Sequence, residues 1–465
     1  MKEPFLKIVD HLNPEDVAML QALYSRSADS VEEHLKRVKE VGSGKFMKQY
    51  YVGFNHKSIA DCGSTTMFTE GVSLLAAKAI QDWPLYSGQE TSTRYINMSQ
   101  QPIIDPIGSA ESLAILEAWM AFYVKHQDRV AEIIALRYPK GEAEKQETYD
   151  RAVKARVFDV LRGFLPAGIT TQLSWHSNLR QADDHLSWML HHPMPEVVRV
   201  ALQLRRLLHE RYPSSGFNHF GGAGVSGVAN KDEGLRDVRQ EWMWRVATEW
   251  TYSARWAPTH AESVDVLSTG FRGLDYDADA RMEPYKEMLA TRPEGCVLPH
   301  FLTSLGQFNL RHLIDFGSFR DAQRHRNGVV QMPLLDTSFG FERWYLEQLG
   351  DPNNGDVGGL RDEAVELIHK QQERIRTLST DPVKRQYYVA LGFRVPCQMT
   401  MALPALLYYL ELRSKKTVHP TLRHQVHNVV RKFQQVYPPE QIALHVDMDP
   451  SDWDVRRGNQ TITKR

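Results

Sequence analysis

Cysteine is scarce in this sequence, and its scarcity limits the chemistry to expect. Only Cys62, Cys296 and Cys397 occur, far apart in the chain and without the spacing of metal ligands. An odd, dispersed set of thiols also argues against a disulfide framework. We therefore expect buried thiols of a reducing compartment and no metal site.

A surplus of charge is also absent. Lys and Arg together number 56 against 57 Asp and Glu, so the formal net charge is -1. No overall field draws such a protein to a nucleic acid polymer or to an anionic membrane, and any bound anion must be held by a local cluster. No apolar run approaches the length of a bilayer span, and the first residues, MKEPFLKIVDHL, do not resemble a cleaved signal. We expect a cytoplasmic protein.

The sequence does contain enough apolar residues for a large core, and its pattern divides into two halves. Residues 214–234, SSGFNHFGGAGVSGVANKDEG, form the most glycine-rich stretch and lie near the middle. Apolar spacing and N-capping residues predict helices in both halves. Those before the stretch cover 14–24, 30–41, 64–81, 109–136, 144–165, 171–190 and 196–211. Those after it cover 280–290, 301–323, 362–378, 386–412 and 419–437, and strands are predicted at 4–12, 96–104 and 263–270.

This common order indicates either an internal duplication or the ordinary alternation of an α+β protein. Two motifs bear on the choice. In the second half, SFRDAQRHR ends in Arg324, His325 and Arg326, two guanidiniums around an imidazole that suit a phosphate or an electron-rich ring. The alternative is a solvated helix end whose cations favour the C-terminal dipole. In the first half, HKSIADCGSTTMFTEGVS is followed by SGQETSTRY.

Together these motifs resemble the flavin-dependent thymidylate synthases, whose signature runs R-H-R-x-x-S-x-N-E-x-S-x-R. RGFLP with SNLRQADDHLSW, and ALLYYLELRSKKTVHPTLRHQV, resemble the family's C-terminal region in the first and second half respectively. The two copies have lost opposite ends of the signature. The first has Asp82, Trp83 and Pro84 in place of the triplet but keeps Ser87, Glu90, Ser92 and Arg94, with Gln89 in place of the signature's asparagine. The second keeps the triplet but has Asp336 in place of the last arginine.

Family members are homo-oligomers with sites between subunits, so the complementary losses have a structural interpretation. A fused pseudo-dimer would retain one composite site, built from both halves, while the other site decayed. The resemblance implies an α+β fold of two tandem copies, each an antiparallel sheet with helices. We expect the first copy at 1–215, a linker at 216–234 and the second copy at 235–465.

The resemblance also implies roles for individual residues. The substrate nucleotide would be bound by Gln89, Glu90, Ser92, Arg94, Arg162 and Arg413. Arg94 and Arg162 would bind its phosphate, and Arg413 would stabilise negative charge on the pyrimidine. The flavin would be held by His56, Ser58, Asn178, Arg180, Arg324, His325 and Arg326. Catalytic roles fall to Arg413 and Arg326. A glutamine that the family uses near the base is Asp321 here, which leaves the identity of the base open.

Each of these residues also has a purely structural interpretation. Ser58 and Ser92 could cap helices or turns, and Glu90 with Arg94 could be a helical i,i+4 pair. His56 could be a turn residue. Arg413 could pair with Glu411 or Asp447 on the surface.

The expected reaction is reductive methylation of a pyrimidine deoxynucleotide at C5, of the dUMP to dTMP type. FAD is the expected cofactor, with methylenetetrahydrofolate and NADPH as co-substrates, and no cysteine nucleophile is required. The alternatives are another pyrimidine nucleotide, hydroxymethylation, or a flavin- or nucleotide-binding protein without turnover. Self-association into a dimer of pseudo-dimers follows from the family's fourfold assembly.

Overall fold

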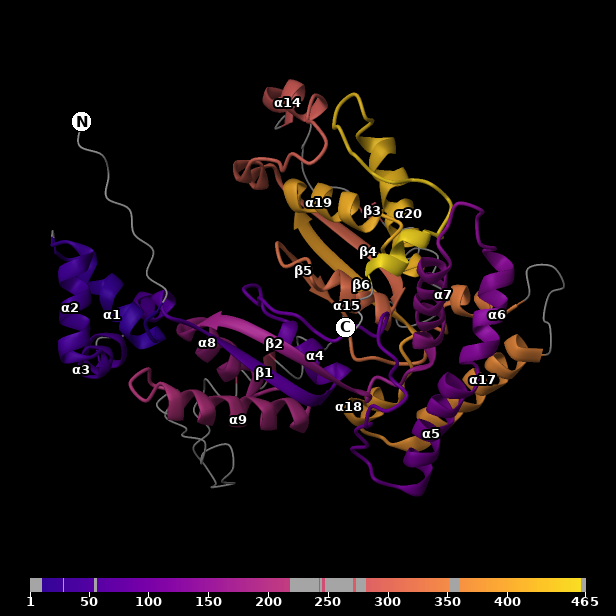
Figure 1. Ribbon diagram of the computed structural model, residues 1–465, viewed down its shortest axis with the longest axis horizontal. Helices are drawn as coiled ribbons and strands as arrows, with labels where there is room; N and C mark the ends of the chain where they lie inside the picture. The colour runs from indigo at the N-terminus through magenta and orange to yellow at the C-terminus, as the bar shows by residue number, and fades with distance from the viewer. Residues whose placement is uncertain are drawn as a thin grey trace. The chain divides into compact units, whose positions relative to one another are not determined.

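The structure is a computed structural model that describes residues 11–27, 29–53, 57–217, 242, 245–246, 271–272, 282–350 and 359–460. Two compact units interleave along the sequence (Figure 1). The first comprises Met1–Glu70, Leu85–Glu90 and Gln172–Thr251, and the second comprises Gly71–Pro84, Thr91–Thr171 and Tyr252–Arg465. None of the described helices combines the length and apolar character needed to cross a membrane.

The first unit begins with helices whose ends follow local sequence signals. Asn13 caps the first helix by accepting from the Asp16 backbone N–H at 3.1 Å, and Pro14 occupies its first position. The predicted helices at 14–24 and 30–41 are confirmed as α1 and α2. The elements of this unit are α1 (Pro14–Tyr24), α2 (Val31–Val41), α3 (Gly44–Phe46), η1 (Met47–Gly53), η2 (Lys57–Cys62), most of β1 (Ser64–Ser73) and β2 (Thr170–Asn178), α8 (Leu179–Met189) and α9 (Pro195–Arg211).

The second unit contains the larger sheet and most of the helices. A four-stranded antiparallel sheet has the order β3-β4-β6-β5, and β4 pairs with β6 from Gln307↔Ala402 to Asp315↔Arg394. The strands are β3 (Phe271–Arg272), β4 (Gln307–Asp315), β5 (Gly328–Gln331) and β6 (Arg394–Ala402). Helices α19 (Leu403–Arg413) and α20 (Pro420–Val436) pack beside this sheet (Figure 1).

The second unit also contains helices that pack against one another and against the segments between the strands. Trp119, in α5, is fully buried and donates its indole N–H to the Tyr388 carbonyl at 3.0 Å. The remaining elements are α4 (Leu74–Gln81), α5 (Ala110–Lys125), α6 (Gln127–Arg137), α7 (Gln146–Leu161), η3 (Arg162–Phe164), η6 (Glu283–Tyr285), α14 (Lys286–Ala290), η7 (His300–Leu305), α15 (Phe316–Ala322), α16 (Arg343–Leu349), α17 (Leu360–Leu378), α18 (Pro382–Arg385), η9 (Gln386–Tyr388) and η10 (Val455–Gln460).

The order of elements repeats between the two halves of the sequence. Each half has a six-residue 3-10 helix, a strand and a short helix, and later a three-residue 3-10 helix, a nine-residue strand and helices of eleven and seventeen residues. Proline stands at the start of both seventeen-residue helices. Such agreement in order and length favours duplication over chance alternation.

Two equivalent segments, 162–169 and 386–393, meet within the second unit and exchange backbone hydrogen bonds. Pro166 pairs with Ala390, the residue at the equivalent place. The flanking bonds occur as equivalent pairs: Ala167 N to Val389 O with Leu391 N to Leu165 O, and Gly168 N to Tyr387 O with Gly392 N to Gly163 O, at 2.8–2.9 Å. This reciprocity is the contact pattern of a two-fold axis, here between two parts of one chain.

The α+β class is confirmed, but four predicted helices are wrong in their first parts. Residues 64–81, 171–190, 301–323 and 386–412 each contain a strand that runs directly into a helix. Burial in β2 alternates from residue to residue along most of its length, as a strand with one covered face requires. The predicted strand at 96–104 is also wrong, since this segment forms an isolated bridge between Ile103 and Ile169, with flanking backbone hydrogen bonds from Ile104 to Gly168 and from Thr170 to Pro102, rather than a continuous strand.

Some predictions fall outside the described residues, namely most of the strand at 4–12, the strand at 263–270, and residues 218–234 of the linker. The division into copies at 1–215 and 235–465 stays a prediction. The two compact units do not follow it, because the second unit takes residues from both halves.

Candidate functional site

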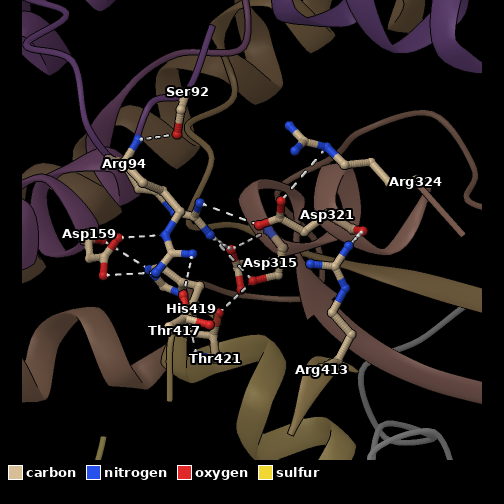
Figure 2. Close-up of polar contacts among 12 residues, drawn as sticks. Ser92, Arg94, Asp159, Asp315, Asp321, Arg324, Arg413, Thr417, His419 and Thr421 are labelled. Carbon is tan, nitrogen blue, oxygen red and sulfur yellow. Dashed lines mark hydrogen bonds and ion pairs between the residues drawn. The ribbon is translucent and has the colours of Figure 1, made fainter. Parts of the chain in front are cut away.

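Charged side chains gather in the second unit where several helices end (Figure 2). Asp159 lies in the last turn of α7, Asp321 in the last turn of α15, and Arg413 is the final residue of α19. Arg162 begins η3, and Arg94 lies in the irregular segment after residue 90. The site therefore combines residues from both halves of the sequence.

The Arg94 guanidinium is held by oxygen atoms on one side (Figure 2). Its Nε donates to Asp159 Oδ1 at 2.8 Å and its Nη2 to Oδ2 at 3.3 Å, while Nη1 donates to the Thr417 carbonyl at 3.1 Å. Burial, with repulsion from the Arg162 guanidinium, lowers the pKa of Arg94 to about 10. Arg94 therefore stays charged at neutral pH.

Arg162 is buried among groups from the second half. Its Nη2 donates to Ser318 Oγ at 3.4 Å and lies 3.8 Å from Asp315 Oδ2, and its Nη1 lies 3.9 Å from Asp321 Oδ2. Burial alone would lower the pKa of Arg162, but Tyr345 and the two carboxylates outweigh it and raise that pKa. Arg162 is therefore a permanent cation in a largely dry environment.

Asp321 lies at the centre of the guanidiniums. Burial would raise its pKa, but the positive charges of Arg324, Arg413, Arg162 and Arg94 outweigh burial and hold the pKa of Asp321 well below its usual range. The carboxylate is ionised at neutral pH and presents only acceptors.

Arg413 joins the basic triplet to Asp321. Its Nε donates to His325 Nε2 at 2.7 Å. Its Nη2 donates to the Asp321 carbonyl oxygen at 2.7 Å (Figure 2). Because His325 Nε2 accepts, the proton of the neutral ring is on Nδ1. Burial and the Arg413 charge lower the pKa of His325 to about 3, which keeps the ring neutral.

A cavity of about 370 Å³ opens beside these residues. Guanidiniums line one part of it, and the apolar side chains of Met401, Tyr408 and Leu412 line another. The full lining is Arg324, His325, Arg326, Asn327, Gly328, Met401, Ala405, Tyr408, Leu412 and Arg413. The structure thus brings the whole triplet together with Arg413, while Arg94 and Arg162 lie outside this lining, on the far side of Asp321.

A line of hydrogen bonds that the sequence did not predict connects Arg162 to Asp159. Arg162 donates to Ser318, the Ser318 and Thr421 hydroxyls are 2.6 Å apart, and the Thr421 hydroxyl lies 2.8 Å from His419 Nδ1. His419 Nε2 donates to the Asp159 carbonyl at 3.1 Å. Burial and nearby arginines hold the pKa of His419 well below its ordinary value, so the ring is neutral. The signal for Asp159 was a charge inside the apolar run VFDVL.

The other predicted site residues lie in the first unit, apart from Ser92, whose hydroxyl accepts from the Arg94 backbone N–H at 3.2 Å. Asn178 caps α8 by accepting from the Gln181 N–H at 2.8 Å, and Arg180 pairs with Asp61 at 2.6 Å. Glu90 and Gln89 bond to β2 through their backbones, Ser58 is exposed in η2, and His56 is outside the described residues.

Several of the structural alternatives can now be decided. Glu90 and Arg94 do not form a helical pair, because no helix covers this segment. Glu411 and Asp447 pair with Arg292 and Arg423 rather than with Arg413. Ser92 does stabilise a turn, as its alternative predicted, and Arg324 and Arg326 are exposed beyond the end of α15.

Fold and site together define an α+β protein whose two halves repeat one order of elements, with a cluster of arginines suited to an anionic ligand. Relatives cover both halves. The chain is 24% identical to a UPF0159 protein of Chlamydia muridarum (90% of this chain and 84% of the relative), 23% identical to one of Chlamydia pneumoniae (90% and 83%) and 22% identical to one of Thermoplasma acidophilum (91% and 93%).

A family model described as thymidylate synthase complementing protein matches residues 7–214. The first half of the chain is thus similar to this family, which is that of the flavin-dependent thymidylate synthases, and the resemblance seen in the sequence is confirmed. The matched region includes Arg94 and Arg162, while the triplet and Arg413 lie in the second half of the sequence, outside it.

Proposed function

We propose that the protein catalyses flavin- and folate-dependent reductive methylation of a pyrimidine deoxynucleotide, of the dUMP to dTMP type, at one composite site per chain. The carbon comes from methylenetetrahydrofolate, the reducing equivalents come from NADPH, and tetrahydrofolate is released. The family supports the class of reaction, thymidylate synthesis. The substrate and the cofactors belong to the proposal.

One observation carries it: Arg94 and Arg162 from the first half share a cluster with Asp321 and Arg413 from the second. Each half on its own has lost part of the family signature. The cluster restores a full set of arginines from the parts that remain. We infer that a site assembled from both halves explains why the two halves have lost opposite parts of the signature.

The nucleotide would lie against these arginines. Arg94 is partly buried, Arg162 is buried, and the two cations approach each other closely enough to repel, so a phosphate between them would relieve the repulsion. Arg413 would contact the pyrimidine and stabilise charge on its carbonyl oxygen. His325 accepts from Arg413 Nε and so fixes the plane of that guanidinium.

The residues around the cavity fit a flavin. Tyr408, Met401 and Leu412 offer an apolar surface for a ring system, and Arg324 and Arg326 offer donors for ring carbonyls or a phosphate. Bound flavin would supply the hydride that reduces the transferred carbon. No thiol is needed, and burial raises the pKa values of Cys62 and Cys397, which makes both poor nucleophiles.

Asp321 motivates a second candidate within the same chemistry. An ionised carboxylate near the base presents only acceptors and would favour a base edge that offers donors, such as the amino group of cytosine. The same cluster would then act on dCMP, or deliver a hydroxymethyl group. We further propose that the chain self-associates into a dimer of pseudo-dimers and works in the cytoplasm.

The test combines a spectrum with product analysis. Purified protein should show flavin absorbance, directly or after reconstitution with FAD, and NADPH should bleach it. Incubation with methylenetetrahydrofolate, NADPH and either dUMP or dCMP should then give a product 14 mass units heavier for one nucleotide. A gain of 30 mass units would indicate hydroxymethylation. A protein that takes up no flavin, or that binds flavin and nucleotide without forming product, would contradict the proposed reaction.

A further inference from the structure

We propose that Arg457 is a positioning residue of the nucleotide site: it shares the Asp159 carboxylate with Arg94 and so leaves positive charge at Arg94 for the substrate phosphate. Arg457 lies in η10, within the C-terminal segment (residues 438–460). The inference rests on the proposed function.

The geometry at Asp159 is that of one carboxylate between two guanidiniums. Asp159 is fully buried, and Arg457 is almost so. Arg457 Nη2 donates to Oδ1 at 2.8 Å and its Nη1 donates to Oδ2, while Arg94 also donates to both oxygens. Four N–H groups thus occupy a carboxylate with about four acceptor positions.

The second guanidinium at Asp159 changes the net charge around Arg94. Asp159 with Arg94 alone would be a neutral pair, with little attraction left for an anion. A second guanidinium makes the group of three side chains positive. Arg94 still has one N–H group on each Nη beyond its bonds to Asp159 and Thr417, because a guanidinium carries five donors. These remaining donors are the ones that we assign to phosphate.

The C-terminal segment is fixed well enough to place Arg457. Arg423, from α20, donates to the carbonyls of Ser451 and Asp449 at 3.0 and 2.6 Å. The Trp453 ring stacks on Tyr138 with centroids 4.7 Å apart. Gly458 lies so close to α7 that a Cβ there would be 2.1 Å from the Thr148 carbonyl oxygen. A bulkier residue would push the segment away from Asp159.

The second half of the sequence lacks this arrangement. The position equivalent to Arg94 is Asp336, and the position equivalent to Asp159 is Val383. The carboxylate therefore occurs only in the copy that keeps the arginine. If the carboxylate served helix packing alone, its presence would not depend on the presence of Arg94 in the same half.

The experiment compares dUMP with deoxyuridine, which lacks the phosphate, as ligands of the full-length protein. Dissociation constants are measured for the wild type, Arg457→Gln, Arg456→Gln and the double variant Asp159→Asn/Arg457→Gln. Arg456 is the matched control, since it is the neighbouring arginine, is exposed and pairs with Asp454. Circular dichroism of each variant checks that it is folded.

Arg457→Gln should weaken dUMP binding by about tenfold or more, the usual value of one charge-assisted hydrogen bond, and should leave deoxyuridine binding nearly unchanged. Arg456→Gln should match the wild type. The double variant should recover part of the preference for dUMP, because Arg94 is then no longer neutralised.

Three results would overturn the inference: an unchanged preference in Arg457→Gln, an equal loss for both ligands, or a double variant worse than the single one. If Arg457→Gln fails to fold, the double variant and Arg457→Lys decide, and the lysine variant should keep most of the preference because it keeps the charge. A wild-type protein that binds dUMP no better than deoxyuridine would refute the nucleotide site itself, and the inference with it.

Discussion

At the scale of single residues, Asp321 stands out because its charge is opposite to that of the side chains around it. Burial raises the pKa of this carboxyl group, but the positive charges of four arginines lower it by more. A carboxylate in such surroundings stabilises the folded state only while it is ionised. Its contribution to stability must therefore depend on pH.

Replacement of Asp321 by asparagine should expose this dependence. The folded-state pKa is depressed, so the stabilisation is fully present above the unfolded-state pKa of about 3.9 and is lost as pH falls below it. Asp321→Asn should therefore be less stable than the wild type at pH 7, with a deficit that shrinks between about pH 4 and pH 3. Urea unfolding across this range measures it. A deficit that is the same at every pH would argue against an ionised Asp321.

Arg326 and Arg94 should have separable roles. Arg326 lines the cavity, whereas Arg94 lies behind Asp321 and is bound to Asp159. Arg326→Ala should release flavin, and Arg94→Ala should weaken nucleotide binding while flavin stays bound. Absorbance after gel filtration reports flavin, and equilibrium dialysis with dUMP reports the nucleotide. If both variants lose the same ligand, the division of labour is wrong.

His325 allows a third test, because its proton affinity depends on its neighbour. Burial is the main cause of its low pKa, and the Arg413 charge adds to it. Arg413→Gln should therefore raise the pKa of His325 from about 3, but not as far as the ordinary value near 6.5, since the burial remains. Titration of histidine-labelled protein by NMR measures the change. A pKa that does not move would contradict the contact between the two side chains.

The sequence singled out candidate residues that belong to motifs and missed the residues that contact them. Arg94, Arg162 and Arg413 were found because each belongs to a recognisable string of residues. Asp159 and His419 were not, since their importance depends on neighbours far away in the chain: His419 contacts the Asp159 carbonyl across 260 positions. Single-residue signals contain no information about such partners.

At the scale of elements, the errors share one physical cause. Each misread segment joins a strand directly to a helix, and both parts bury apolar residues, so an apolar pattern continues without a break. In three of the four segments the boundary was nevertheless present as a capping residue: Ser73, Asn178 and Asp315 each accept a backbone N–H from the third residue of the helix that follows. The helices that begin after a turn or proline, such as α1 and α20, were predicted nearly to the residue.

The backbone hydrogen bonds between segments 162–169 and 386–393 should be sensitive to any side-chain volume added at the contact. A Cβ on Gly168 would lie 2.8 Å from the Ile104 carbonyl oxygen and 2.9 Å from that of Tyr387, both backbone atoms that cannot move aside cheaply. Gly168→Ala should cost about 1–3 kcal/mol of unfolding free energy. The control is Gly141→Ala, where the nearest atom belongs to the flexible Glu144 side chain and the change should stay within about 0.5 kcal/mol. Equal denaturant midpoints for the two variants would contradict the close approach.

At the scale of the whole molecule, the two halves of the sequence repeat one order of elements but differ in the residues at the equivalent positions of the proposed site. The position equivalent to Arg162 is Gln386, whose side chain is used locally: its Oε1 accepts from the Leu335 N–H at 2.9 Å and its Nε2 donates to the Val383 carbonyl at 3.3 Å. The positions equivalent to Arg413 and Asp321 are Met189 and Ala79. The pseudo-symmetric position thus lacks the cations of the first site. The sequence predicted this asymmetry from the complementary losses. It could not show that a side chain such as Gln386 forms hydrogen bonds with neighbouring backbone groups instead.

This asymmetry predicts a binding stoichiometry of one nucleotide per chain rather than two. Buried arginines hold phosphate by charge-assisted hydrogen bonds, and an amide already paired with backbone groups cannot replace them. Titration calorimetry with dUMP should therefore saturate at one equivalent. Arg162→Gln, which copies the second half's residue into the first, should abolish this binding, whereas Gln386→Arg should not create a second site, because Asp336 and Met189 remain. A second equivalent in the wild type would show that both positions kept their ligand, and the complementary losses would then need another explanation.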